Sequence, residues 1–226
     1  MLSRRQLILG TLGIMLIPRI SSAKTIDDYC FEITPQVTIG VKQTVITTEN
    51  FLRQNRNVIA AINGVYFGKD RLPEGLVYLA EDNHFATEKP EHTRGYFLVS
   101  KNGTKIEVKE NLDKALENYW LAVGTHPLLV VNRQVHSQAK EKRYASVLAY
   151  RSAIGTKSGR DICFAVSQQQ LSMQTWAEKL KSSGYTGAIN LDGGPYSRLS
   201  VRQGDRINPI GKGNQPTSLV IFSYRR

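Results

Sequence analysis

A carboxylate followed by two glycines marks the stretch NLDGGPYSRL, residues 190–199. Asp192 comes directly after the strand-like run GAINL, and Gly193 and Gly194 permit a tight exit turn and close approach of a ligand to the main chain. A strand end holds a carboxylate still while the following loop leaves it open to substrate, so Asp192 is a candidate nucleophile or general base. Asp-Gly is also common in plain turns, and the stretch alone leaves both interpretations open.

A second polar group follows another apolar run, in the stretch AINGVYFGKDRLPEGL. Asn63 offers an amide donor and acceptor suited to sugar hydroxyls, Gly64 lets the chain turn, and the nearby Tyr66 could stack on a sugar ring. Glu74, at the end of the same stretch, is a candidate for a second catalytic carboxyl group. A plain Asn-Gly turn is the alternative interpretation.

Three further segments supply candidate binding groups. His126 precedes the apolar run PLLVV, where a lone histidine is often structural. Arg151 stands beside small residues in YRSAIG, where its guanidinium could hold a phosphate in a bidentate fork or form an ordinary ion pair. Ser197 and Arg198 follow the Asp-Gly-Gly turn and could bind the same anion.

The elements that must position these groups are mostly strands. Runs rich in β-branched and aromatic residues predict strands at 29–34, 37–41, 57–62, 75–80, 95–100, 105–108, 120–124, 127–131, 150–155, 161–167, 187–191, 199–201 and 218–224. Short helices are predicted at 48–55 and 111–118. Many strands with few helices predict an α+β fold, a β-rich single domain with mixed sheets and a few packed helices.

The clearest helix covers residues 172–184, where apolar side chains recur at helical spacing between Ser172, a suitable N-cap, and Gly184, a suitable end. It lies between the strand-like runs 161–167 and 187–191. This strand, helix, strand unit would deliver Asp192 to the end of its second strand.

The first residues, MLSRRQLILGTLGIMLIPRISSAKT, are typical of an export signal. The apolar run 7–17 has 11 residues, whereas a helix that spans a bilayer needs about 20, so we expect no permanent membrane anchor. Arg4 and Arg5 resemble a twin-arginine signal, with an ordinary secretory signal as the alternative. We expect cleavage after Ala23, a mature domain over residues 24–226 and a periplasmic location in a bacterium.

The chain is basic, with a formal net charge of +11 that becomes +8 when the three arginines of residues 1–23 are removed. Such a charge favours anionic partners, among them phosphorylated sugars and envelope glycans. Nucleic acid is not an expected partner, because the protein is predicted to be exported and its cations are scattered. Only Cys30 and Cys163 are present, and the sequence leaves open whether they pair or Cys163 is a buried thiol.

Five stretches in one order, NGVYF, PEGL, THPLLV, YRSAIG and NLDGG, resemble the phosphodiester glycosidase family over about residues 57–224. The resemblance implies hydrolysis of a sugar joined through its anomeric carbon to a phosphodiester. It implies that Asp192 acts as nucleophile or base, that Glu74 is the second carboxyl group, that Asn63 orients sugar hydroxyls, and that Arg151, with Arg198, holds the phosphate. No cofactor is expected.

The sequence departs from the family pattern at Val65, Pro195, Tyr196 and His126, so the substrate could differ and a histidine role is not carried over. A non-catalytic periplasmic protein that binds glycans or the envelope is the alternative function. A metal-dependent nuclease or phosphatase is disfavoured, because the mature sequence holds no HExxH, HxH or DxD arrangement.

Overall fold

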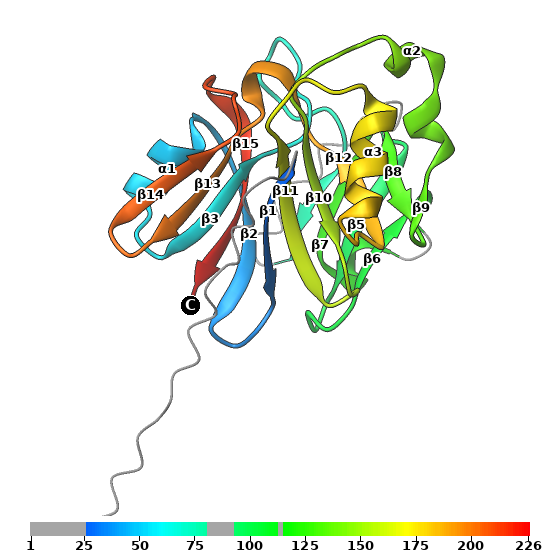
Figure 1. Cartoon of the computed structure of the whole chain (residues 1–226). Helices are drawn as coiled ribbons and strands as arrows, with labels where there is room; N and C mark the ends of the chain where they lie inside the picture. Colours follow the sequence, from blue (N-terminus) through cyan, green and yellow to red (C-terminus); the bar gives the residue numbers. More distant parts are fainter. Residues whose placement is uncertain (1–25, 81–92, 113–114) are drawn as a thin grey trace, which may run out of the picture.

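The computed structural model describes residues 26–80, 93–112 and 115–226, which form three packed sheets with a few short helices (Figure 1). The central sheet contains, in spatial order, β1 (Ile26–Glu32), β11 (Asp161–Ser167), β10 (Ser152–Thr156), β12 (Gly187–Asn190), β8 (Leu128–Val131) and β9 (Gln134–Val135). β11 and β12 each run antiparallel to β10, which lies between them. β11 and β12 therefore point the same way, and their ends carry the chain to the same edge of the sheet.

Two smaller sheets flank the central one. The five-stranded sheet contains β14 (Arg206–Ile210), β13 (Leu199–Gln203), β3 (Val58–Asn63), β15 (Thr217–Arg225) and β2 (Val37–Ile46). The four-stranded sheet contains β4 (Val77–Leu79), β7 (Tyr119–Thr125), β5 (Gly95–Ser100) and β6 (Ile106–Lys109). Apolar side chains of all three sheets, such as Ile62, Phe97 and Ile154, meet in one shared core.

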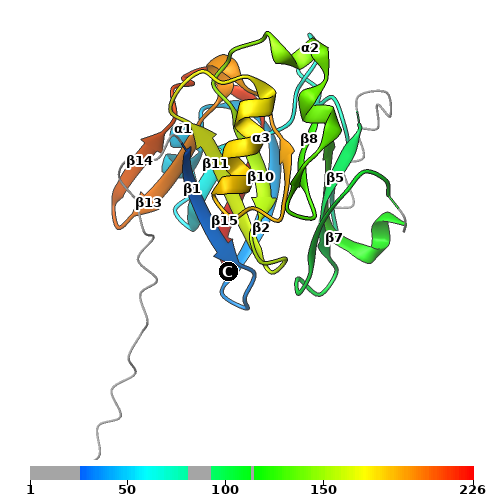
Figure 2. The same cartoon turned by 45° about the vertical axis from the view of Figure 1, so that its right-hand side comes forward.

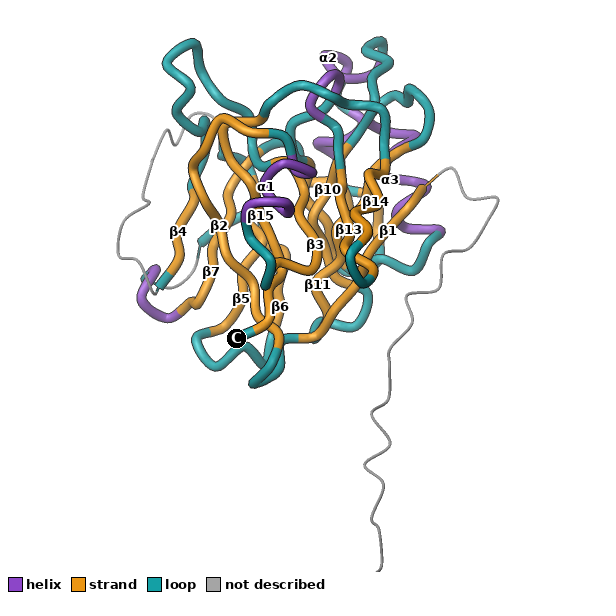
Figure 3. The backbone as a smooth tube through the Cα atoms, turned by 90° about the vertical axis from the view of Figure 1, so that its left-hand side faces the viewer, coloured by secondary structure: helices purple, strands orange, loops and turns teal. Residues whose placement is uncertain are grey.

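The helices cover the outer faces of two sheets. α3 (Met173–Ser182) lies on the central sheet (Figure 2), where Met173, Trp176, Ala177 and Leu180 are buried against small strand residues. Ser172 caps its first turn by accepting a hydrogen bond from the Thr175 N–H. α1 (Thr48–Gln54) packs on the five-stranded sheet (Figure 3). α2 (Lys142–Ala145) is a single turn that precedes β10. None of the helices within the described ranges is long and apolar enough to cross a membrane.

The structure confirms the predicted β-rich α+β class, with one difference in the sheets. Mixed sheets were expected from the many strands and few helices, but every described pairing of neighbouring strands is antiparallel. The two strands that α3 connects do run the same way, but β10 separates them. The helices predicted at 48–55 and 172–184 are present as α1 and α3. Of the helix predicted at 111–118, residues 113–114 lie outside the described ranges and Leu116–Asn118 form a 3₁₀ turn.

Cys30 and Cys163 form a disulfide, which answers the question that the sequence left open. The two residues face each other across the antiparallel pair of β1 and β11. The bond therefore ties the first described strand of the protein to the central sheet. The export signal predicted for residues 1–23 lies outside the described residues.

Candidate active site

Asp192 lies just beyond the end of β12, where the central and five-stranded sheets meet. Its backbone N–H donates to the carbonyl of Gly64, at 3.0 Å, and its carbonyl accepts from the Asn63 amide, at 2.7 Å. Asn63 is the last residue of β3. The end of β3, in the five-stranded sheet, thus holds the main chain of Asp192 through both its N–H and its carbonyl, which fixes where its carboxylate starts.

Asp192 as a residue is only 9% exposed, and its surroundings favour the protonated form of the carboxyl group. Burial, which has the largest effect, and the negative charge of Glu74 together raise the pKa of Asp192 to about 7, although the Gly193 N–H, which donates to Oδ1 at 2.8 Å, lowers it. A carboxyl group that changes protonation state near neutral pH is suited to proton transfer or nucleophilic attack.

The two glycines behind Asp192 are required by the local geometry. A Cβ on Gly193 would lie 2.7 Å from the carbonyl oxygen of Tyr150, closer than side-chain atoms come. Gly194 has a φ of +60°, and its N–H donates to the same carbonyl at 2.8 Å. The turn therefore lies directly on the segment that leads into β10.

Glu74 reaches the site on the loop between β3 and β4. The loop closes on itself, because the Glu74 N–H donates to the Tyr66 carbonyl at 2.6 Å and Phe67 pairs with Pro73. The Glu74 side chain is half-buried and close enough to Asp192 for its charge to affect the Asp192 pKa. The structure therefore brings together the two carboxyl groups that the sequence proposed as a pair.

Tyr66 and His126 form one wall of the site. The rings stack with their centres 5.0 Å apart, and the Tyr66 hydroxyl accepts a hydrogen bond from the Asn190 amide at 2.7 Å. Burial and the charge of Asp192 raise the pKa of the Tyr66 phenol above its ordinary value, so the phenol keeps its proton. Tyr144, on α2, also lies near His126, with ring centres 6.4 Å apart.

Arg151 lies beneath the glycine turn, almost fully buried. Its Nε donates to the Leu171 carbonyl at 2.9 Å and its Nη2 to the Val147 carbonyl at 2.5 Å. Burial lowers the pKa of the guanidinium, and the nearby Tyr66 raises it. Two nitrogens of the Arg151 guanidinium therefore bind backbone carbonyls. The positive charge lies close to Tyr66, and the Arg151 side chain passes beside Gly193.

Three of the predicted binding residues are engaged in holding the site together. The Asn63 Oδ1 accepts from the Ser152 hydroxyl at 2.8 Å and from the Arg198 N–H at 3.1 Å. The buried Ser197 hydroxyl donates to the Arg151 carbonyl at 2.8 Å. The Arg198 guanidinium forms an ion pair with Glu49. These contacts fasten the loop of Asp192 to β3, β10 and the start of α1.

Sequence reasoning missed Ser152, Tyr144 and the role of Asn190. Ser152 and Asn190 carry a detectable signal, because each is a polar residue at one end of a buried strand, Ser152 at the start of β10 and Asn190 at the end of β12. Such a residue needs a buried partner, and at a strand end that partner is often part of a site. Tyr144 gives no such signal, because it comes from a short helical turn that belongs to none of the motifs.

The side chains with metal-ligand spacing and a large groove both lie away from Asp192. The one group of described His, Cys, Asp or Glu side chains with metal-ligand spacing is Cys30, Cys163 and Asp161, and its sulfurs are already joined in the disulfide. A groove of about 680 Å³ is lined by residues such as Glu107, Arg133 and Thr156. This groove lies at the ends of β10 and β12 that are remote from Asp192. The candidate active site is therefore assigned from its carboxyl groups and their partners, and not from the volume of a cavity.

The chain is similar in fold to solved structures of known and unknown activity. The catalytic domain of zebrafish N-acetylglucosamine-1-phosphodiester alpha-N-acetylglucosaminidase, auto-inhibited by its pro-peptide, matches with a TM-score of 0.65 and 16% identity, over 92% of this chain and 86% of that one. A hypothetical protein from Synechocystis matches with a TM-score of 0.60 and 14% identity, over 89% of this chain and 59% of that one.

Sequence comparison gives the family directly. No curated protein sequence matches the chain significantly. The model of the phosphodiester glycosidase family, in contrast, matches residues 56–222, a span that includes Asn63, Glu74, Arg151 and Asp192. The chain therefore belongs to the phosphodiester glycosidase family.

Proposed function

We propose that the protein is an exported hydrolase that releases a sugar from a sugar phosphodiester in the bacterial cell envelope. The observation that carries the proposal is the Asp192 carboxyl group, buried beside Glu74, with a pKa raised to about 7. Family membership and the fold shared with the zebrafish glycosidase domain support the same reaction class. The disulfide is in keeping with export, because such bonds persist in oxidising compartments.

In the proposed reaction, the bond between the anomeric carbon and the phosphate oxygen breaks. Positive charge builds on the sugar ring and negative charge on the departing phosphate. The ionised form of Asp192 attacks the anomeric carbon or takes a proton from the attacking water. Water supplies the new hydroxyl group, and the products are the free sugar and a phosphomonoester.

The remaining groups have supporting roles in this proposal. Glu74, as the second carboxyl group, handles the proton of the water or of the departing oxygen. Phosphate is a good leaving group, so its negative charge needs stabilisation more than its oxygen needs a proton. The Arg151 charge supplies that stabilisation from beneath the turn. The Tyr66 phenol keeps its proton and can donate a hydrogen bond to a substrate oxygen.

The test is turnover of a substrate panel by the purified mature protein. The panel contains sugar phosphodiesters, aryl glycosides, and phosphodiesters without a sugar. We expect hydrolysis of the first group and a loss of roughly a thousand-fold or more in kcat for Asp192→Asn. Asp205→Asn, which makes the same change in an exposed turn next to Gly204, is the matched control and should leave kcat unchanged.

Two outcomes would contradict the proposal. Normal turnover by Asp192→Asn would remove Asp192 from the catalytic machinery. Binding of a sugar phosphodiester without turnover by the wild type, across the panel, would favour the non-catalytic envelope-binding function instead.

A further inference from the structure

Large apolar side chains are exposed at one end of the molecule. Among the described residues, those that are more than a third exposed are Val45, Leu72, Val147 and Leu148, which range from 42% to 63%. They come from three segments that are far apart in the sequence: the end of β2, the loop between β3 and β4, and the segment between α2 and β10. Exposed apolar residues that are scattered singly need no explanation, but a common location does.

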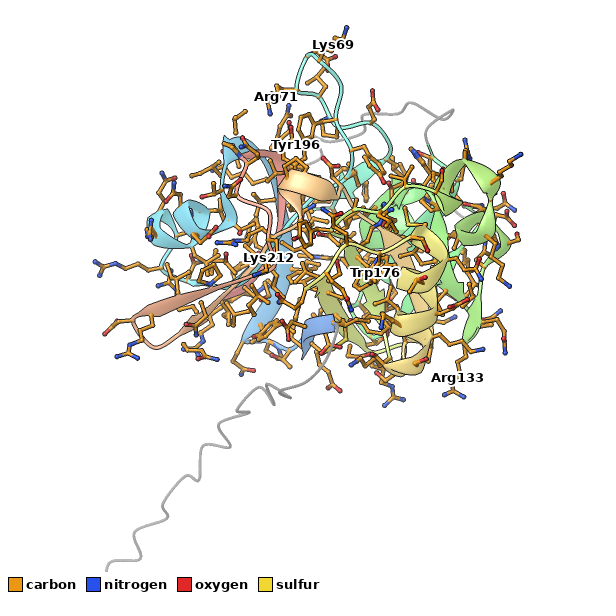
Figure 4. The ribbon with its side chains drawn as sticks, turned by 45° about the horizontal axis from the view of Figure 1, so that its top comes forward. Lys69, Arg71, Arg133, Trp176, Tyr196 and Lys212 are labelled. Carbon is orange, nitrogen blue, oxygen red and sulfur yellow. A yellow bond between two sulfur atoms is a disulfide. The ribbon has the colours of Figure 1, made fainter. Side chains whose placement is uncertain are left out.

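All four lie at the end of the molecule where Asp192 is placed. Val45 precedes Ile46, which pairs with Thr217 at the same end of the five-stranded sheet as Asn63. The Val147 carbonyl accepts from Arg151, whose neighbour Ser152 bonds to Asn63. The loop that contains Leu72 projects at this end with Lys69 and Arg71 (Figure 4). The described turns at the opposite end expose no comparable side chain.

Exposed cations accompany these apolar residues. Lys69 and Arg71 flank the tip of the loop, Lys142 begins α2, and Lys212 follows β14 beside the turn of Tyr196. None of the four forms an ion pair with a side chain in the described ranges. Exposed cations such as Arg133 and Arg160 also occur at the opposite end, so the apolar side chains are what distinguish the Asp192 end.

We propose that this end of the molecule, called here the docking face, binds the surface of an anionic phospholipid bilayer. Its apolar members are Val45, Leu72, Val147 and Leu148, and its basic members are Lys69, Arg71, Lys142 and Lys212. Apolar side chains gain by entering the boundary between headgroups and acyl chains, and lysines and arginines beside them are attracted to the anionic headgroups. A protein partner is less suited, because the apolar residues are dispersed among charges around the site and form no continuous patch.

The docking face gives the active site a position at the membrane. Taken with the proposed function, on which this step rests, it identifies the substrate class as sugar phosphodiesters whose second ester is a membrane lipid. A protein bound through this face would present Asp192 to the headgroup layer, where the phosphate of such a lipid lies.

The test is sedimentation of the mature protein with vesicles of phosphatidylcholine, with and without phosphatidylglycerol. We expect binding to the anionic vesicles that weakens as salt is added. Val147→Ser with Leu148→Ser removes apolar surface and keeps the Val147 carbonyl, and should weaken partitioning roughly ten- to thirty-fold. Lys69→Glu with Arg71→Glu should weaken it at least thirty-fold and flatten the salt dependence.

Arg133→Glu with Arg160→Glu, at the opposite end, is the matched charge control and should bind almost as the wild type does. Thermal melting confirms that each variant is folded. Three results would overturn the proposal: no binding of the wild type to anionic vesicles, unchanged binding by the Val147 and Leu148 variant, or equal loss in the control pair. Vesicle binding does not depend on turnover, so the docking face and the proposed function can fail separately.

Discussion

In the reaction that we propose, the chemistry depends most on Asp192, and its raised pKa should make the activity depend on pH. Attack by Asp192, or activation of water by it, requires the ionised carboxylate. With a pKa of about 7, the ionised fraction increases as pH rises through 7, so kcat/KM should rise there and level off above it. A profile of kcat/KM from pH 5 to 9 tests this, and a fall through pH 7 would assign Asp192 to proton donation instead.

The same burial predicts that Asp192 destabilises the fold at high pH. The folded-state pKa is raised above the ordinary value of 3.8 to about 7, so the folded protein binds the extra proton between these pH values and stability falls as pH rises through that window. Asp192→Asn removes an ionisation penalty of up to about 4 kcal/mol at pH 8. Urea unfolding should show the variant to be more stable at pH 8, with a much smaller difference at pH 4. Equal stability at both pH values would contradict the raised pKa.

The sequence predicted candidate groups better than it predicted their roles. Asp192 and Glu74 were identifiable, because a carboxyl group near a strand end and glycines is a local pattern. The role of Asn63 was not, because its partners Ser152 and Asp192 lie 89 and 129 residues further along the chain. The Asn63 side-chain nitrogen donates to Asp192, and its oxygen accepts from Ser152 and Arg198. Only the folded structure brings these partners together.

At the scale of elements, the site depends on hydrogen bonds that join β10 to β3. The Ser152 hydroxyl contacts Asn63 at 2.8 Å and Ser197 at 2.9 Å. Ser152→Ala would leave these buried groups short of a partner, and should reduce stability by about 1 to 3 kcal/mol and also lower kcat, because the Asp192 loop is released. Kinetics and thermal melting of the variant measure both effects.

Ser200 offers a matched control for that prediction. Ser200 lies on β13 of the five-stranded sheet and is also fully buried. Its hydroxyl contacts the hydroxyl of Thr48, at the start of α1, at 2.7 Å. Ser200→Ala should reduce stability by a similar amount and leave kcat unchanged. Equal losses of kcat in both variants would show that the hydrogen bond of Ser152 has only a structural effect.

The elements themselves were largely predictable, because strand runs and the α3 pattern are local. Every predicted strand has a counterpart, but two observed strands were missed: β9 (Gln134–Val135) has only two residues, and β14 (Arg206–Ile210) contains a proline. The pairing directions were not predictable. Whether the strands at the two ends of α3 are neighbours depends on β10, which enters between them and precedes both in the sequence.

At the scale of the whole molecule, the proposed functions are concentrated at one end. Asp192, Glu74 and the docking face lie where β3 ends and β10 begins. The turns at the opposite end carry the groove near Arg133. This arrangement leaves the far end free to change without affecting catalysis, and it makes the Arg133 and Arg160 variant a control for both proposals.

The disulfide contributes at this largest scale, because it joins residues 133 positions apart. Closing a loop of that length restricts the unfolded chain, and the chain-entropy model gives a contribution of about 4 to 5 kcal/mol to the free energy of unfolding. Cys30→Ser with Cys163→Ser should therefore lower Tm by roughly 10 °C or more. The bond lies within the β1 and β11 pair and touches no site residue, so kcat measured well below Tm should be unchanged. Wild-type protein treated with a reductant should unfold like the double variant, and an unchanged Tm in both samples would show that β1 is held by its strand pairing alone.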